Sequence, residues 1–321
     1  VVLGHKARDV IAVLENLAVS WHINDDYQSE MFNSVKMGVE SLKHDSEAFF
    51  ILPVDIPLVR SQTLRILMES SGKDTPQIRY PTFLGERGHP PLIPRQYAGE
   101  LGRWSGNGGL KRFLEQYDHK SLEVPVFDKG ILMDMDTPEQ YGRIVARYKS
   151  RQIPLKSECM AMMATRFSEN HPVVKHSRVV ARLAREIGKK LVQAGCLVNI
   201  DLMEACGYLH DIGKGKRNHA GFGAEILKNM GYPHIADIIV SHMDLSFAGG
   251  GEITEKEVVY LADKLAYREK ILPLEKRLEL KLEQLSGHPE GQMAAEKRMQ
   301  TAMKIKRDIE KIVGRNIATA G

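Results

Sequence analysis

The second half of the chain holds histidines and aspartates whose types and order suit a metal centre. His210 and Asp211 are adjacent in the segment GYLHDIGK at residues 207–214, which ends with Lys214. An imidazole and a carboxylate at the end of a predicted helix can offer a nitrogen and an oxygen ligand to one divalent ion. The same helical region also contains His176, His219, His242 and Asp263. This clustering predicts a metal site in the second half of the chain.

Helical patterns would bring these side chains together. Apolar residues recur every three or four positions from residue 173 to residue 191, and His176 lies on that inward stripe. Further helices are predicted at residues 202–209, 220–230, 234–242 and 258–267. Asp263 falls on the inward face of the last of them, where an unpaired carboxylate would be costly to bury and a metal would offset the cost. For His176, a hydrogen-bonded core histidine remains an alternative.

The order His176, His210-Asp211, Asp263 resembles the HD superfamily of metal-dependent phosphohydrolases over residues 171–270. The resemblance implies that these four residues bind an ion such as manganese, iron, nickel, cobalt or magnesium. It also implies that the ion would activate a water molecule toward phosphorus, with Asp211 and Lys214 as catalytic residues.

Other residues of this half correspond less directly to the HD superfamily. His219 and His242 correspond to second-ion or phosphate ligands, with solvated or core histidines as the alternative. Arg217 and Arg268 are candidate phosphate contacts or surface charges.

The first half alternates predicted strands with predicted helices, which indicates an α/β domain with a mostly parallel sheet. The strands are predicted at residues 1–3, 19–23, 48–54, 77–83, 124–126 and 130–133. The helices are predicted at residues 7–17, 29–42, 61–70 and 137–149. In such folds ligands bind at the carboxyl ends of the strands.

Carboxylates occupy two such strand ends. Asp55 follows the strand at 48–54 and could bind the magnesium of a nucleoside triphosphate, although it could equally cap a helix or turn the chain. Asp134 and Asp136 follow the last predicted strand, where Asp136 or Thr137 could instead cap the helix that begins near Pro138.

Seven segments of the first half, in order, resemble the molybdenum cofactor nucleotidyltransferase-like family over residues 1–148. They are NDDY at 24–27, MFNSVKMG at 31–38, LPVDIPL at 52–58, YPT at 80–82, RGHPPLI at 87–93, GNGGL at 106–110 and DMDTPE at 134–139. The resemblance implies a Rossmann-like domain that binds magnesium with CTP or GTP and transfers a nucleotidyl group to a phosphate-bearing acceptor such as molybdopterin.

By the same resemblance, Asp55 is the metal-binding aspartate, with Asp136 and then Asp134 as second ligands. The segment that begins Arg87, Gly88, His89, Pro90 would hold the acceptor. The family's first strand and Gly-rich phosphate loop have no counterpart here. The expected sheet therefore lacks its first strand, and transfer activity is not predicted for the sequence as given.

Composition limits the remaining possibilities. The formal net charge of +4 falls short of a nucleic-acid footprint, and 43% hydrophobic with 27% charged residues is typical of a globular protein. The longest apolar run, at residues 48–54, is too short to cross a membrane, and no signal peptide opens the chain. Three cysteines without a Cys-x-x-Cys pair indicate free thiols in the cytoplasm. The initial Val1 suggests a fragment or a processed product.

The predicted organisation is a nucleotidyltransferase-like domain at 1–150, a linker at 151–170 and an HD phosphohydrolase domain at 171–321. Two helices within 274–317 would cover the bundle or form a homodimer. The leading hypothesis is a phosphohydrolase acting on a small phosphoester or nucleotide. The alternative is an HD module that senses a nucleotide or pterin without turnover and regulates the transferase.

Overall fold

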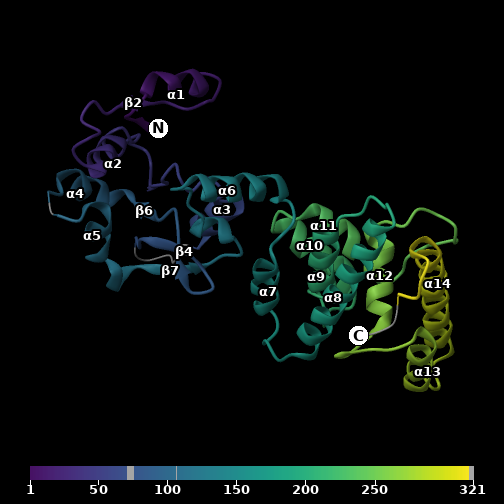
Figure 1. Ribbon diagram of the computed structural model, residues 1–321. Helices are drawn as coiled ribbons and strands as arrows, with labels where there is room; N and C mark the ends of the chain where they lie inside the picture. The colour runs from purple at the N-terminus through teal and green to yellow at the C-terminus, as the bar shows by residue number, and fades with distance from the viewer. Residues whose placement is uncertain (71–75, 106, 318–321) are drawn as a thin grey trace. The chain divides into compact units, whose positions relative to one another are not determined.

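The computed structural model of the protein describes residues 1–70, 76–105 and 107–317 (Figure 1). Gly106, the first residue of the GNGGL segment, therefore lies outside the described residues. The chain divides into two compact units, Val1–Ile144 and Val145–Gly321, and the division falls within helix α6 (Pro138–Ser150). The segment expected to be a linker, 151–170, contains helix α7 (Lys156–Ala164), in which Cys159, Met162 and Met163 are buried.

The first unit has α/β architecture, as the sequence predicts. Its strands are β1 (Val2–Leu3), β2 (His22–Ile23), β3 (Ala48–Phe50), β4 (Arg79–Phe83), β5 (Glu86–Arg87), β6 (Leu92–Pro94) and β7 (Leu122–Pro125). Strands β1 and β2 pair in parallel, and a second sheet has the order β3-β6-β4-β5 with β7 also paired to β4. The β4–β7 pair is parallel and the other pairs of this sheet are antiparallel, so the pairing is mixed.

A tight hairpin explains part of the antiparallel pairing. Phe83 pairs with Glu86, which leaves Leu84 and Gly85 as a two-residue turn with φ angles of 52° and 86°. Two successive positive φ values are those of a type I′ turn, whose twist matches the flanking strands. Leucine at such a position gives no turn signal, so β5 and β6 were not predicted from the sequence.

The strand predicted at residues 130–133 is wrong, because residues Lys129–Leu132 form a 3-10 turn (η3). Asp128 accepts hydrogen bonds from the backbone N–H of Gly130 at 2.9 Å and of Arg60 at 2.7 Å. This buried carboxylate caps the turn and ties it to helix α3. Gly130 lies so close to Leu58 that a Cβ would be 2.5 Å from the Leu58 carbonyl oxygen.

The predicted helices of the first unit are confirmed, and two further helices are present. They are α1 (Ala7–Leu14), α2 (Met31–Glu40), α3 (Ser61–Glu69), α4 (Ala98–Arg103), α5 (Gly109–Glu115) and α6, with 3-10 turns η1 (Arg95–Tyr97) and η2 (Asp118–Lys120). A core of buried residues joins α2, α4 and α5 to the sheet through Phe32, Phe49, Ile93, Leu101 and Phe113.

The second unit is helical, as predicted. It comprises α7, α8 (Pro172–Gln193), α9 (Ile200–Leu209), α10 (His219–Asn229), α11 (Pro233–Ile239), α12 (Glu255–Leu265), α13 (Leu274–Gln284) and α14 (Pro289–Val313), with one small hairpin of β8 (Ala266–Tyr267) and β9 (Lys270–Ile271). Helices α8, α9 and α12 pack against one another in the bundle (Figure 1). Within the part of the chain that the structure describes, no helix has the length and apolar character needed to cross a membrane.

Side-chain caps fix where several of these helices begin. Asn199 accepts a hydrogen bond from Leu202 N at 3.0 Å, and Asn218 accepts one from Gly221 N at 3.2 Å. Thr254 forms a capping box with Glu257 at the start of α12. These caps fix the first residues of α9, α10 and α12, the helices that carry or lead to the candidate ligands.

Gly207 allows α8 and α9 to approach closely. A Cβ at this position would lie 2.4 Å from the Cα and 2.6 Å from the backbone nitrogen of Ala181. Backbone atoms cannot move aside as a flexible side chain can, so any larger residue must push the two helices apart.

We therefore expect Gly207→Ala to lower the free energy of unfolding by about 2–3 kcal/mol, in the range of overpacked cores. Thermal and denaturant unfolding would measure the loss. The control is Gly142→Ala in α6, where a Cβ meets nothing within 4 Å and the loss should be absent. Equal unfolding free energies for Gly207→Ala and the wild type would contradict the close helix contact.

Candidate metal centre

Six side chains from five segments of the second unit converge at one place. His176 comes from α8, and His210 and Asp211 lie at the C-terminal end of α9. The remaining three come from the first residue of α10, from the turn after α11 and from α12. They are His219, His242 and Asp263. His210, Asp211, His242 and Asp263 are buried, and His176 and His219 are half-buried.

The hydrogen bonds of His210 show which of its nitrogens is free. Its Nδ1 lies 2.9 Å from the carbonyl oxygen of Gly207, which can only accept, so Nδ1 carries the proton. Its Nε2 is buried without a hydrogen-bond partner among the described residues. Asp263 Oδ1 lies 3.6 Å and Asp211 Oδ2 lies 3.7 Å from that nitrogen. A lone pair that faces two carboxylate oxygens calls for a cation between them, which is the arrangement of a metal ligand.

The first group of possible ligands consists of His176, His210 and Asp211, whose ligand atoms all lie within 4.8 Å of one another. Asp263 joins this group because its Oδ1 is 3.0 Å from His176 Nε2. Nitrogen and oxygen donors in this combination suit first-row divalent metals. The four residues expected to bind the first ion are therefore brought together.

The second group consists of Asp211, His219 and His242, also within 4.8 Å of one another. Asp211 Oδ1 lies 3.3 Å from His219 Nε2 and 3.5 Å from His242 Nε2. The two imidazole nitrogens are 3.2 Å apart, and His242 Nδ1 donates to the carbonyl oxygen of Ile239 at 2.6 Å. His242 therefore also points an unprotonated nitrogen inward. Asp211 presents Oδ2 to one group and Oδ1 to the other, as a carboxylate shared by two ions does.

Electrostatics favour ionised carboxylates at this centre. Burial by itself would raise the pKa of Asp211, but the nearby imidazoles of His210, His219 and His242 hold that pKa below its usual value. Burial would likewise raise the pKa of Asp263, but Lys264 and His176 keep it well below its usual value. Both carboxylates therefore stay charged and able to bind a cation.

The histidine pKa values differ between the two groups. Burial lowers the pKa of His242, which favours its neutral, metal-binding form. Burial would also lower the pKa of His210, but Asp211 and Asp263 outweigh it and raise that pKa. The carboxylates thus attract positive charge to the site of the unpartnered His210 nitrogen. A metal ion there would satisfy the same attraction.

Lys264 is a member of the site that was not predicted from the sequence. Its Nζ donates to Asp263 Oδ2 at 2.6 Å and to the carbonyl oxygen of His242 at 3.0 Å. It is buried, with its ammonium 4.6 Å from the ring centroid of Tyr260. In the sequence, Lys264 stands among the apolar residues Leu261, Ala262 and Leu265, which could have indicated that it is buried. Lysines are rarely buried without a partner, so a buried Lys264 would also be expected to have one.

The other predicted residues of this half are exposed to solvent. Lys214 Nζ is 3.2 Å from Asp211 Oδ2, and the lysine side chain is exposed. Arg217 and Arg268 are exposed as well. Lys214 therefore lies beside the candidate ligand Asp211, while Arg217 has no contact with the candidate ligands among the interactions described.

In the first unit, Asp55 carries a buried oxygen that could bind a metal ion. Its Oδ1 is buried with no hydrogen-bond partner among the described residues, and so is Nδ1 of His89. Burial lowers the pKa of His89, and the charge of nearby Asp55 opposes that effect. A buried carboxylate oxygen without a donor suits a bound magnesium ion, which accepts oxygen ligands.

The structure does not gather the other candidates around Asp55. Asp134 and Asp136 are exposed, and Asp134 Oδ1 accepts a hydrogen bond from Gln140 at 2.7 Å. Thr137 and Gln140 exchange two hydrogen bonds at the start of α6, which is the capping alternative for this segment. Among the described residues, no ligand group of the kind found around Asp211 includes these aspartates, so their metal role stays a prediction.

Arg87 is engaged by other protein groups. It forms ion pairs with Asp118 at 2.7 Å and Glu123 at 2.9 Å, and it stacks on Tyr80 at 4.6 Å. The neighbouring segment packs closely, because a Cβ at Gly88 would lie 2.5 Å from the Ile131 carbonyl oxygen, which also accepts from His89 N at 2.9 Å. Pro90 is buried. Acceptor binding by these residues stays a prediction.

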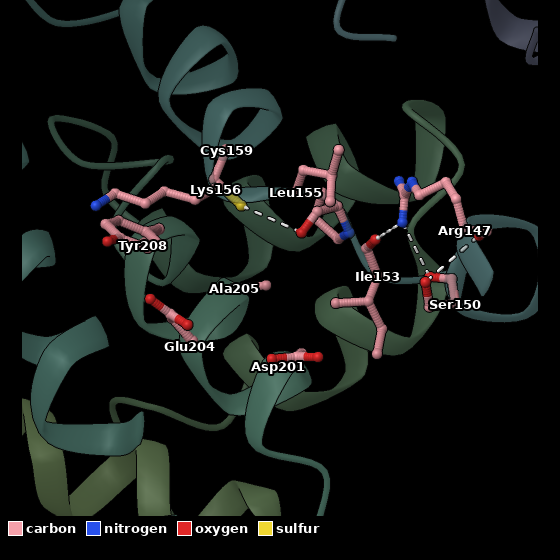
Figure 2. Close-up of a pocket in the computed structure, with 11 residues that line it drawn as sticks. Arg147, Ser150, Ile153, Leu155, Lys156, Cys159, Asp201, Glu204, Ala205 and Tyr208 are labelled. Atoms are coloured by element: carbon pink, nitrogen blue, oxygen red, sulfur yellow. Dashed lines mark hydrogen bonds between the residues drawn. The ribbon is translucent and has the colours of Figure 1, made fainter. Parts of the chain in front are cut away.

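A cavity of about 180 Å³ lies elsewhere in the second unit, among α6, α7 and α9 (Figure 2). Its lining includes Arg147, Cys159, Glu204 and Tyr208, and Arg147 pairs with Glu158 at 2.9 Å. Burial raises the pKa of Cys159 above its usual value, so this thiol stays protonated. None of the candidate metal ligands lines this cavity.

Comparison with known proteins assigns both parts of the chain. Residues 1–121 match the family model of the MobA-like NTP transferase domain, and residues 173–268 match that of the HD domain. Both domains are therefore found in this chain, the MobA-like NTP transferase domain before the HD domain, which confirms the fusion expected from the sequence.

Two individual proteins are also similar to parts of the chain. "Uncharacterized protein MJ0778" of Methanocaldococcus jannaschii is 29% identical over 164 residues, which cover 50% of this chain and 86% of that protein. The crystal structure of Rv0371c from Mycobacterium tuberculosis H37Rv matches with 23% identity and a TM-score of 0.40. That match covers 45% of this chain and 74% of that chain.

Lys264 gives the prediction that tests this geometry. Lys264→Met removes the donor that orients Asp263 and the His242 backbone, and we expect Mn²⁺ binding to weaken by about 10–100-fold, the usual cost of losing a group that positions ligands. Isothermal titration calorimetry would measure the affinity. Lys256→Met, at an exposed position of the same helix, is the control and should bind as the wild type does. Identical affinities for both variants would show that Lys264 does not support the centre.

Proposed function

We propose that the HD domain is a metal-dependent phosphohydrolase that acts on a small phosphoester or nucleotide. The observation that carries the proposal is the shared Asp211 carboxylate between two groups of imidazoles, with His210 Nε2 buried and unpartnered. Nitrogen and carboxylate ligands around two neighbouring positions form the kind of site that stabilises both the attacking and the leaving oxygen of a phosphoryl group.

The protein residues have separate roles in this proposal. His176, His210, Asp211 and Asp263 would hold the first ion, and His219 and His242 together with Asp211 would hold the second. Bound ions would polarise a phosphoryl oxygen and lower the pKa of an attacking water molecule. The buried positions of His210 and Asp263 exclude solvent from the inner side, so substrate must approach from the side of exposed Lys214.

Lys214 would bind the substrate rather than the metal. Its ammonium lies 3.2–3.3 Å from the two oxygens of Asp211 and remains open to solvent. A cation at this distance can neutralise a phosphate oxygen as negative charge develops during displacement. Asp211 in turn keeps the flexible lysine side chain at the site before substrate arrives.

For the first unit we propose a nucleotide site at Asp55, with magnesium and CTP or GTP as its ligands and a pterin phosphate as acceptor. The support is the buried, unpartnered Asp55 oxygen together with the match to the MobA-like NTP transferase domain. A sensing role for the HD domain is the rival proposal, and it differs by predicting bound metal without turnover.

Replacement of Asp211 tests the phosphohydrolase directly. Asp211→Ala removes a ligand from both groups, so we expect loss of bound metal and a decrease in hydrolysis of more than about 100-fold. The assay would screen phosphomonoesters, nucleotides and cyclic dinucleotides under multiple-turnover conditions. Asp237→Ala, an exposed aspartate paired with Lys228 at 3.7 Å, is the control. Unchanged turnover in Asp211→Ala would rule out the mechanism.

His219 separates a two-ion from a one-ion centre. His219→Ala leaves His176, His210 and Asp263 in place, so we expect bound manganese to fall from two ions per chain to one. Elemental analysis after equilibration with Mn²⁺ would measure this, with His234→Ala at an exposed position as the control. Two ions in His219→Ala, or one in the wild type, would contradict the second ion position.

A further inference from the structure

Two arginines share one tyrosine ring next to the metal centre. The guanidinium carbon of Arg277 lies 4.8 Å from the centroid of Tyr267, and that of Arg268 lies 5.4 Å from it. Tyr267 is in β8, four residues after the candidate ligand Asp263, while Arg277 comes from α13. Stacking on an aromatic face holds a guanidinium in a fixed orientation and leaves its N–H edge available.

Neither arginine is neutralised by the protein. Among the described residues, no ion pair or hydrogen bond joins Arg268 or Arg277 to a carboxylate, and Nε of Arg277 is buried without a partner. The carboxylate in the same hairpin, Glu269, is paired with Lys175 at 3.1 Å. Burial lowers the pKa of Arg277, and the charge of Asp263 opposes this effect. A half-buried guanidinium remains charged nonetheless, and an anion bound beside it would offset more of its desolvation cost.

Contacts with the helices that carry His176 and Asp263 position the two arginines. Lys175, which holds Glu269, precedes His176 on α8. Tyr267 continues directly from α12, which carries Asp263 and Lys264. The arginines therefore lie toward the His176–Asp263 part of the centre, whereas Lys214 contacts Asp211. Arg277 also falls outside residues 173–268, the part that matches the HD domain.

We infer that Arg277 and Arg268, stacked on Tyr267, form a subsite for a second phosphate group of the substrate. This inference rests on the proposed phosphohydrolase function and narrows its substrate class to molecules with more than one phosphate, such as nucleoside diphosphates and triphosphates. One phosphate would bind at the metal centre, and a further phosphate would accept hydrogen bonds from the two guanidinium groups.

Polyphosphate length provides the test. The full chain, loaded with Mn²⁺, would be titrated with inorganic phosphate, pyrophosphate and tripolyphosphate by calorimetry. We expect the wild type to bind at least one of the longer ions at least about tenfold more tightly than phosphate, as charge-assisted hydrogen bonds to a guanidinium allow. In Arg277→Met the longer ions should bind no more tightly than phosphate, while the affinity for phosphate should stay unchanged.

Two further variants separate binding from folding. Lys276→Met, at the exposed position next to Arg277, should keep the gain in affinity of the longer ions over phosphate. Arg268→Asn should reduce the gain in affinity, because it removes one of the two guanidinium groups. Asparagine is chosen because it tolerates the left-handed backbone of residue 268, whose φ is 54°. A gain in affinity that persists in Arg277→Met would overturn the inference, and so would a wild type that binds all three ions equally. Failure of phosphate itself to bind the Mn²⁺-loaded chain would instead overturn the proposed function.

Discussion

The structure of the second unit depends on one buried carboxylate. Asp211 places each of its oxygens against a different set of imidazoles, and without a cation four inward nitrogens and two carboxylates would face one another in a site closed to solvent on its inner side. A buried charge is tolerated only when it is paired or binds a metal. The segments that meet at Asp211 are therefore joined by the charge they surround as well as by their apolar faces.

The candidate ligands are brought together by packing, by a helix cap and by a buried lysine, none of which is itself a candidate ligand. Gly207 lets α9 approach α8, so that His210 and Asp211 reach the position opposite His176. Asn218 is the N-cap of α10, so that the helix begins with the candidate ligand His219. Lys264 then links the turn after α11 to α12. Each constraint acts on a different segment, and each affects the distance between ligand atoms.

The sequence predicted the parts of this site that follow from pattern. The adjacent pair His210-Asp211, the inward stripe with His176 and the inward position of Asp263 could all be read from helical periodicity, and the helices were confirmed within a few residues. Arg277 could not be read in this way, because arginine on a helix is usually solvated and only tertiary packing shows which arginines are buried. For Lys264 the only sequence signal was its apolar neighbours. In the first unit, the Leu84-Gly85 turn and the Asp128 cap changed the strand assignment for the same reason, since both depend on local geometry rather than on apolar periodicity.

The central claim is that Asp211 joins two metal positions, and anomalous diffraction from crystals soaked in Mn²⁺ tests it most directly. We expect two anomalous peaks, one within bonding distance of His210 Nε2 and the other of His242 Nε2, with the carboxylate of Asp211 contacting both. A single peak that leaves His219 and His242 without an ion would reduce the centre to one metal. No peak at Asp211 would contradict the claim.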